Sequence, residues 1–151
     1  MGVMQIPRRV DYGLRAAIYL STQDPDRNCS LAEIARHQGI PRKFLEKIIQ
    51  NLIHSGLVKS KRGPDGGYTL TRAPDEISFQ DVIEAIEGPI AINVCMDQHL
   101  SCGHFSQCTM SGVWSEIQYK IVEVFTRTTL ADLRRFPRPA LAASSSLSSA
   151  A

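Results

Sequence analysis

The chain has 151 residues, of which 43% are hydrophobic, so it is long enough for one domain with a real core. Its four cysteines are too few and too clustered for a secreted disulfide scaffold, and no apolar run approaches the roughly eighteen residues of a membrane span. The net charge of +2 is unevenly distributed along the chain: residues 1–73 carry twelve Lys and Arg against six Asp and Glu, and residues 74–151 carry five against nine. The basic first half is therefore expected to bind a polyanion.

The N-terminal letters MGVMQIPRR lack the apolar segment of a signal peptide, so we expect a cytoplasmic protein.

The first elements are helical. Apolar residues recur at helical spacing over residues 8–21, which predicts a helix there. Ser30 and Glu33 form a capping box, with Glu33 reaching back to the Ser30 amide, and the short helix that they open ends at Gly39.

The next helix, over residues 41–55, has one apolar and one polar face. Pro41 suits its first position, and Gly56 suits the position just after its end. A short capped helix, a tight turn and a second amphipathic helix are typical of a helix-turn-helix, whose second helix enters the major groove of DNA. Arginine and lysine can donate to guanine, and glutamate can accept from cytosine. The predicted DNA-contacting residues are Arg42, Lys43, Phe44, Glu46, Lys47 and Gln50.

A basic hairpin follows this helix. Strands are predicted over residues 58–61 and 68–71, around the glycine-rich letters RGPDGG. A charged helix face alone is more often simply solvated, but a helix-turn-helix followed by a basic hairpin is a winged helix, whose wing arginine can enter the minor groove. The predicted wing contacts are Lys59, Lys61, Arg62, Gly66 and Gly67. The fold class is therefore mostly α with a small β-wing.

The second half adds two predicted helices and a longer one. Ser78 caps a helix over residues 78–87, and Thr129 caps a short helix over residues 130–135. Between them, residues 110–126 form a long amphipathic helix whose apolar stripe exceeds what its own domain can cover. We divide the chain into a winged helix-turn-helix (1–89), a cysteine loop (90–109), the long and short helices (110–136) and a disordered tail rich in Pro, Ala and Ser (137–151).

The loop is rich in thiols and poor in apolar residues, which predicts that it orders around something the thiols hold. Its residues are Cys95, Cys102 and Cys108, with His99 and His104 between them. The residues alone leave open an iron–sulfur cluster, a structural zinc site with one histidine as fourth ligand, a metal-free dithiol switch, and a coincidental clustering of cysteines. The intervals of six and five residues differ from the closely spaced pairs of structural zinc, and soft thiolates suit iron–sulfur clusters. The fourth cysteine, Cys29, stands alone and is expected to be a small buried residue or a spare one.

Five segments together resemble one family, the IscR/NsrR-type winged-helix regulators of bacteria. They are DYGLRA from Asp11, LAEIARHQGI from Leu31, FLEKIIQNLIHSGLVKSKRGPDGGYTL from Phe44, ISFQDVIEAIEGP from Ile77 and TTLADL from Thr128. The resemblance covers about nine-tenths of the chain. It implies a homodimeric transcription regulator, most often a repressor, that binds a near-palindromic operator and packs its long helix against a second subunit.

The resemblance also implies an iron–sulfur cluster on the three loop cysteines that senses nitric oxide, redox state or iron–sulfur supply. Ser111 stands where IscR-type members place a histidine ligand, whereas Asp11 matches the aspartate that NsrR-type members supply from the partner subunit. A [4Fe–4S] cluster with Asp11 of the partner subunit is therefore favoured, a [2Fe–2S] cluster stays open, and His99 and His104 are the other candidate ligands. From its position alone, Asp11 is equally well explained as a charge at a helix N-terminus.

Two other functions compete with a cluster-based regulator. One is a winged-helix regulator whose cysteine loop is a structural zinc site or a thiol switch. The other is an electron carrier or enzyme that uses the same cluster, but no nucleophile–base pair, phosphate loop or second cysteine set supports it. We therefore expect no catalytic residues and no enzyme activity.

Overall fold

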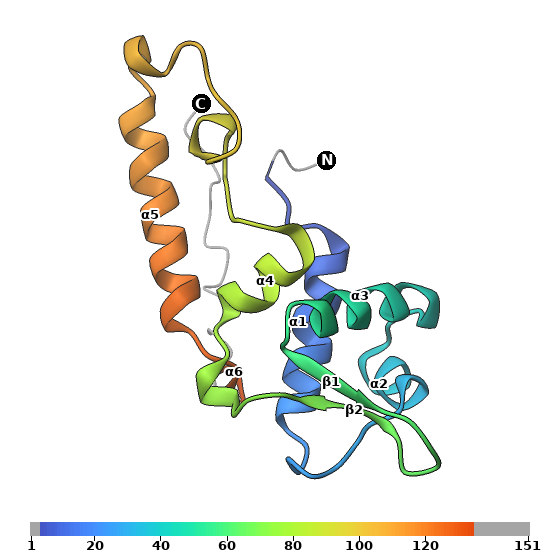
Figure 1. Cartoon of the computed structure of the whole chain (residues 1–151). Coiled ribbons are helices and arrows are strands. Elements are labelled where there is room, and N and C mark those ends of the chain that lie inside the picture. The colour runs from blue at the N-terminus through green and yellow to red at the C-terminus, as the bar shows by residue number, and fades with distance from the viewer. Residues whose placement is uncertain (1–3, 135–151) are drawn as a thin grey trace, which may run out of the picture.

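The structure is a computed structural model that describes residues 4–134. A head of five helices and a hairpin carries one long helix along one side (Figure 1). The helices and strands are α1 Arg8–Ser21, α2 Leu31–Gln38, α3 Arg42–His54, β1 Val58–Lys61, β2 Gly67–Leu70, α4 Phe79–Glu87, α5 Ser111–Arg127 and α6 Leu130–Leu133. Short 3₁₀ turns lie at η1 Pro74–Glu76, η2 Val94–Met96 and η3 Phe105–Gln107. The mostly helical fold class with a two-stranded wing is confirmed.

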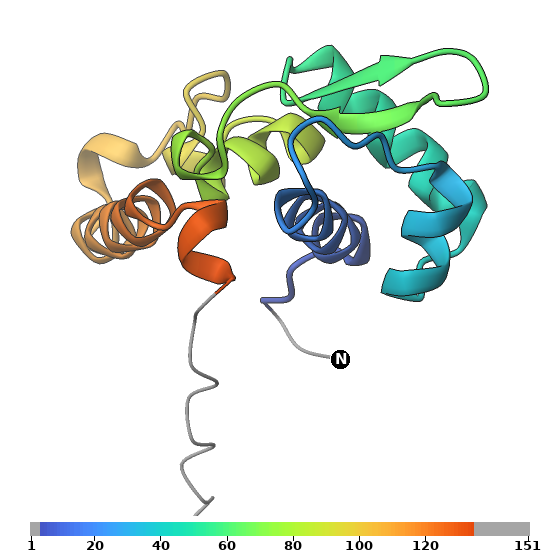
Figure 2. The ribbon, with the colours of Figure 1, turned by 90° about the horizontal axis from the view of Figure 1, so that it is seen from below.

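The long helix and the wing lie on opposite sides of the molecule. Figures 1 and 2 both show α5 on one side, α2, α3 and the hairpin on the other, and α1 and α4 between them. Helix α1 packs against α2, α3, α4 and α6, so it is the central element of the head. The segment between α4 and α5 extends beyond the head and runs beside the first turns of α5 (Figure 1). Within residues 4–134, no helix is both long enough and apolar enough to cross a membrane.

The apolar stripes predicted from the sequence form one core. Ile34, Leu45, Ile49 and Leu52 are fully buried where α2 and α3 meet α1. Helices α1 and α4 come close at Gly13, where a Cβ atom would lie 2.0 Å from Cδ1 of Ile86. Cys29 is fully buried in this core, as expected.

Side-chain caps fix where α2, α4 and α6 begin. Ser78 accepts a hydrogen bond from the Asp81 amide, and Asp81 accepts from the Ser78 amide, which completes a capping box. Thr129 and Asp132 do the same for α6. Ser30 accepts from the Glu33 amide at 3.1 Å, but the predicted return bond is wrong. The Glu33 carboxylate instead accepts hydrogen bonds from Tyr19 and Arg27.

Several predicted boundaries are displaced by one residue. Pro41 precedes α3 with an extended ψ of 127° and caps it through its carbonyl, so it is not the first helical residue. The second strand is Gly67–Leu70, and the long helix is Ser111–Arg127. Helix α6 ends at Leu133, earlier than predicted. The predicted disordered tail lies outside the described residues.

The segment after α5 returns to the head. Leu130 is fully buried, and its amide donates to the Ile77 carbonyl at 2.9 Å. The Phe79 amide donates to the Thr128 carbonyl at 2.7 Å. Leu130 thus completes the core of the head, although it lies 41 residues beyond the end of the predicted DNA-binding domain at residue 89. The domain boundaries themselves stay predictions.

Candidate nucleic-acid interface and cysteine loop

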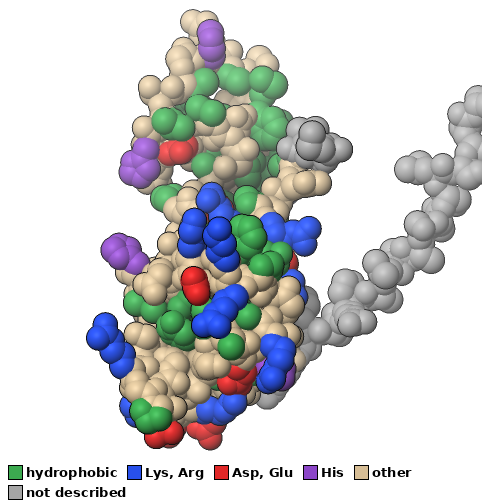
Figure 3. Space-filling view, turned by 90° about the vertical axis from the view of Figure 1, so that its right-hand side faces the viewer, with side chains coloured by type: hydrophobic (Ala, Val, Ile, Leu, Met, Phe, Trp, Pro, Cys, Tyr) green, Lys and Arg blue, Asp and Glu red, His purple; other side chains and the backbone are tan. Residues whose placement is uncertain are grey.

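Helix α3 separates its buried and exposed residues as the sequence predicts. Its apolar face packs on the core, and the other face is exposed at Arg42, Lys43, Phe44, Glu46, Lys47 and Gln50. Figure 3 shows Lys and Arg side chains gathered over this side of the molecule, with apolar side chains between them. Nε of Arg42 lies 3.8 Å from Oε1 of Glu46, a loose i,i+4 ion pair in which both side chains stay more than half exposed.

The wing and α3 lie beside a common hollow. A cavity of about 490 Å³ is lined by Leu31, Arg42, Glu46, Lys47, Gln50 and Tyr68. The residues that line this cavity come from α3, the start of α2 and strand β2. The structure therefore brings the predicted helix contacts and the wing together, as a winged helix requires.

The wing residues divide into two groups. Lys59, Lys61 and Arg62 are exposed, and residues two apart on a strand share a face, so Lys59 and Lys61 point the same way. Gly66 and Gly67 are half-buried. A Cβ at Gly66 would lie 2.2 Å from the Lys61 carbonyl oxygen, and one at Gly67 would lie 2.5 Å from the Cys29 carbonyl oxygen. The structure thus gives both glycines a role in wing geometry, and their DNA contacts stay a prediction.

The cysteine loop holds its thiols half-exposed. Cys95, Cys102 and Cys108 form no disulfide with one another, and His99 and His104 are exposed. Within residues 4–134, no three His, Cys, Asp or Glu side chains converge as metal ligands in the single chain. Gln118 of α5 anchors the start of the loop, because it accepts from the Ile92 amide at 3.0 Å and donates to the Ile90 carbonyl.

Ser111 joins the cysteine loop to α5 through two hydrogen bonds. Its hydroxyl donates to the Cys108 carbonyl at 2.9 Å, and its amide donates to the same carbonyl. The serine therefore fixes the junction between the loop and α5.

Asp11 lies exposed on the first turn of α1, at the rim of a groove of about 840 Å³. The groove is lined by Gln5, Ile6, Pro7, Arg8, Asp11, Leu14, Phe79, Ile83 and Phe125. Its walls come from α1, α4 and α5, so the carboxylate is open to a group approaching from outside the chain. The Asp11 side chain retains 54% of its exposure.

One contact of this site was not predicted from the sequence. Nη1 of Arg15 lies 3.6 Å from Oδ2 of Asp11, and Nη2 of Arg15 donates a hydrogen bond to the Gln38 carbonyl. Gln38 is the last residue of α2, and Gly39 turns the chain toward α3 with a left-handed φ of 61°. A single guanidinium therefore connects Asp11 to the turn of the helix-turn-helix.

The helix-turn-helix, the wing and the basic exposed face of α3 define a DNA-binding transcriptional regulator of the winged-helix class. The Rrf2 family, described as iron-dependent transcriptional regulators, matches residues 6–135. The chain belongs to this family.

Known transcriptional regulators are similar to this chain in both sequence and structure. The chain is 34% identical over 134 residues to the helix-turn-helix regulator CymR of Bacillus subtilis (strain 168), which covers 88% of this chain and 91% of that protein. The solved structure of CymR, the global cysteine regulator of B. subtilis, has a TM-score of 0.74 at 32% identity and covers 90% of this chain and all of that one. IscR of T. potens has a TM-score of 0.71 at 31% identity and covers 87% of each chain. These relatives are regulators, and this protein is a regulator rather than an enzyme.

Proposed function

We propose that the protein is a homodimeric operator-binding repressor whose DNA affinity depends on an iron–sulfur cluster. Cys95, Cys102 and Cys108 hold the cluster, and Asp11 of the partner subunit is the fourth ligand. The donor set fits: three uncrosslinked soft thiols on one loop suit a [4Fe–4S] cluster, and the exposed carboxylate is within reach of another chain. The observation that carries the proposal is the Asp11–Arg15–Gln38 connection.

The apolar face of α5 supports the dimer. No side chain of α5 is buried in the single chain, and several large apolar ones are exposed. They include Val113 at 59% and Val124 at 43%, and Met110, directly before the helix, is 59% exposed. A contiguous apolar face of this kind needs a partner. A second copy of this chain is the occupant that also brings its cysteine loop to Asp11.

The signal reaches the DNA-binding face through α1. When bound, the cluster supplies an oxygen-ligated iron that nitric oxide or oxidants attack more readily than an all-thiolate one. Asp11 is then held in place by the partner's loop, and Arg15 keeps its second nitrogen on the Gln38 carbonyl. When Asp11 is released, the Arg15 guanidinium can move with it. Because the guanidinium nitrogens are held in one plane, the nitrogen bonded to the Gln38 carbonyl then moves too. The turn before α3 then loses a fixed support, and operator affinity falls.

The Arg15 link serves geometry more than stability. The Asp11–Arg15 pair is a partly exposed i,i+4 ion pair, and such pairs contribute only about 0.3–0.5 kcal/mol. Tyr12, one residue after Asp11, packs against Phe44 with ring centroids 6.5 Å apart. Helix α1 is therefore joined to the recognition helix at a second point beside Asp11.

Iron and sulfide analysis tests the cluster directly. Anaerobically isolated protein is expected to be brown, with about four iron and four sulfide per chain, as a [4Fe–4S] cluster requires. Two of each would correct the cluster to [2Fe–2S]. One zinc per chain in a colourless protein would overturn the sensor and leave a regulator with a structural loop.

Salt dependence tests the wing contact. Replacing Lys59 with methionine is expected to weaken binding to operator and to random DNA about equally, because a phosphate contact carries no sequence information. The slope of log K against log salt should become shallower by about 0.9. Fluorescence anisotropy at several salt concentrations measures both. An unchanged slope would place Lys59 outside the interface.

A further inference from the structure

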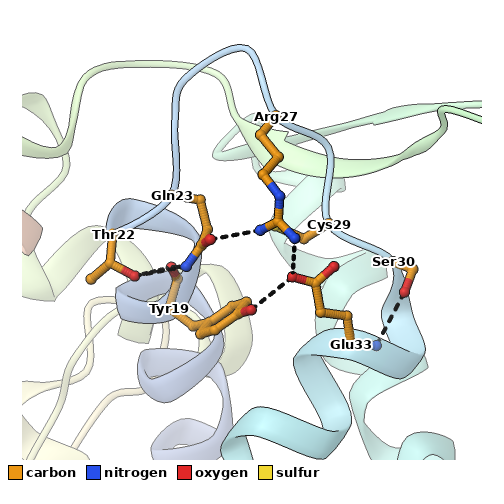
Figure 4. Close-up of polar contacts among 7 residues, drawn as sticks. All are labelled: Tyr19, Thr22, Gln23, Arg27, Cys29, Ser30 and Glu33. Atoms are coloured by element: carbon orange, nitrogen blue, oxygen red, sulfur yellow. Dashed lines mark hydrogen bonds and ion pairs between the residues drawn. The ribbon is translucent and has the colours of Figure 1, made fainter.

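A polar cluster outside the proposed sensor site occupies the loop between α1 and α2. Oε1 of Glu33 accepts hydrogen bonds from the Tyr19 hydroxyl at 2.8 Å and from Nη2 of Arg27 at 2.6 Å. Nη1 of Arg27 donates to Oε1 of Gln23 at 2.6 Å. Figure 4 shows these side chains converging from α1, the loop and α2. We call Tyr19, Arg27 and Glu33 the loop triad.

The triad has one stable protonation state at neutral pH. Burial alone would raise the pKa of the Glu33 carboxyl, but the hydrogen bonds from Tyr19 and Arg27 and the guanidinium charge hold this pKa below its ordinary value. Burial and the hydrogen bond to Glu33 raise the pKa of Tyr19. The carboxylate therefore stays charged and the phenol stays protonated, so acceptor and donors keep their roles. Only 17% of the Glu33 side chain is exposed, against 47% for Arg27.

The loop that the triad fixes also holds the wing. Cys29 and Tyr68 exchange two backbone hydrogen bonds, of 2.9 and 2.8 Å, which attach strand β2 to the loop. Nη1 of Arg27 lies 3.5 Å from Sγ of Cys29. Nδ2 of Asn28 donates to the Asp65 carbonyl in the wing tip at 3.2 Å. At Gly67 the backbones are too close for any side chain, so β2 cannot shift without moving the loop.

We propose that Tyr19, Arg27 and Glu33 are positioning residues for the wing. By holding the loop that carries Cys29, they set the angle of the hairpin relative to α3, and so determine how firmly the protein holds the DNA flanking the bases that α3 contacts. This inference rests on the proposed function in one respect: the wing must contact DNA.

The charge of Glu33 allows a test in which two explanations predict opposite signs. If Glu33 acted only through its charge, Glu33→Ala would tighten DNA binding, because a negative charge is removed near phosphates. If it positions the wing, operator affinity should fall by about tenfold, the usual effect of losing a good DNA contact. Hydroxyl-radical footprinting of the full-length protein should then show protection lost at the operator flanks and kept at the centre.

Matched variants separate positioning from folding and charge. Asp75→Ala removes the same charge from an exposed residue outside the triad and should leave the flank protection intact. Tyr19→Phe removes one hydrogen bond with no change of charge and should weaken flank protection in the same direction. If the triad acts as a unit, adding Arg27→Met to Glu33→Ala should cause little further loss of flank protection, although removal of the Arg27 charge lowers overall affinity.

The outcomes are distinguishable. Unchanged flank protection in both Glu33→Ala and Tyr19→Phe would overturn the positioning role and leave the proposed function untouched. Absence of flank protection in the wild-type protein would overturn the wing contact, and the inference with it. Circular dichroism and urea unfolding establish that each variant is folded, and Tyr19→Phe provides the decisive comparison if Glu33→Ala is not.

Discussion

Replacing Cys102 with alanine is expected to abolish iron and sulfide binding and to lower operator affinity by about 5- to 150-fold, the usual range of coupling between two sites. The reason is that two thiols and one carboxylate cannot complete the cluster, so Asp11 of the partner subunit is no longer held. Replacing Asp11 with alanine should change affinity in the same direction. Anaerobic visible absorption and operator titration by fluorescence anisotropy measure the two effects on one sample.

The fourth cysteine provides a matched control. Cys29 is fully buried in the head, far in sequence from the loop, and has no place in the proposed ligand set. Cys29→Ala should therefore keep iron and sulfide binding, at some cost in the free energy of unfolding. Full operator affinity in a cluster-free Cys102→Ala protein would contradict the coupling between loop and DNA, although it would leave the DNA-binding regulator itself intact.

Replacing Arg15 with methionine should separate sensing from response. Arg15 provides no cluster ligand in the proposal, so the variant is expected to bind iron and sulfide as the wild-type protein does. Because the link from Asp11 to the Gln38 carbonyl is lost, the ratio of operator affinities with and without the cluster should fall from about 5- to 150-fold toward one. Operator titrations before and after anaerobic removal of the cluster give this ratio.

Another arginine of the same helix controls for charge. Arg9 forms an ion pair with Glu87 of α4 at the surface, and within residues 4–134 it has no hydrogen bond or ion pair to the turn before α3. Arg9→Met removes the same charge from α1, and the affinity ratio should stay at its wild-type value. If Arg15→Met responded to cluster loss as strongly as Arg9→Met, coupling would have to run by another route, such as the Tyr12–Phe44 contact.

Elements specified by neighbouring residues were predictable from the sequence. Ser78 with Asp81 and Thr129 with Asp132 determine helix starts within four residues, and both capping boxes are present. The order of helices, wing and long helix likewise follows from local periodicity and turn residues. Boundary errors arose where a residue suits two adjacent positions, as Pro41 suits both the cap and the first turn.

Contacts between long side chains of different helices were not predictable in this way. The spacing of Asp11 and Arg15 indicates an i,i+4 pair, but the reach of Arg15 to Gln38 depends on how α1 crosses α2. Glu33 shows the same limit, because its sequence context fits a capping box while its position beside Tyr19 and Arg27 gives stronger partners. The residues that connect the site to the DNA-binding face therefore emerge only from the packed structure.

The return of the chain at Leu130 has a consequence for biosynthesis. The core that supports α3 includes a residue near the end of the described chain, held to Ile77 by a backbone hydrogen bond. During translation, the N-terminal 89 residues leave the ribosome while this core still lacks one of its members. We expect a nascent or prematurely terminated chain to fold incompletely and to occupy operators poorly. Only chains that already carry the cysteine loop and α5 would then compete for DNA, so a DNA-binding head without its cysteine loop would not occupy operators.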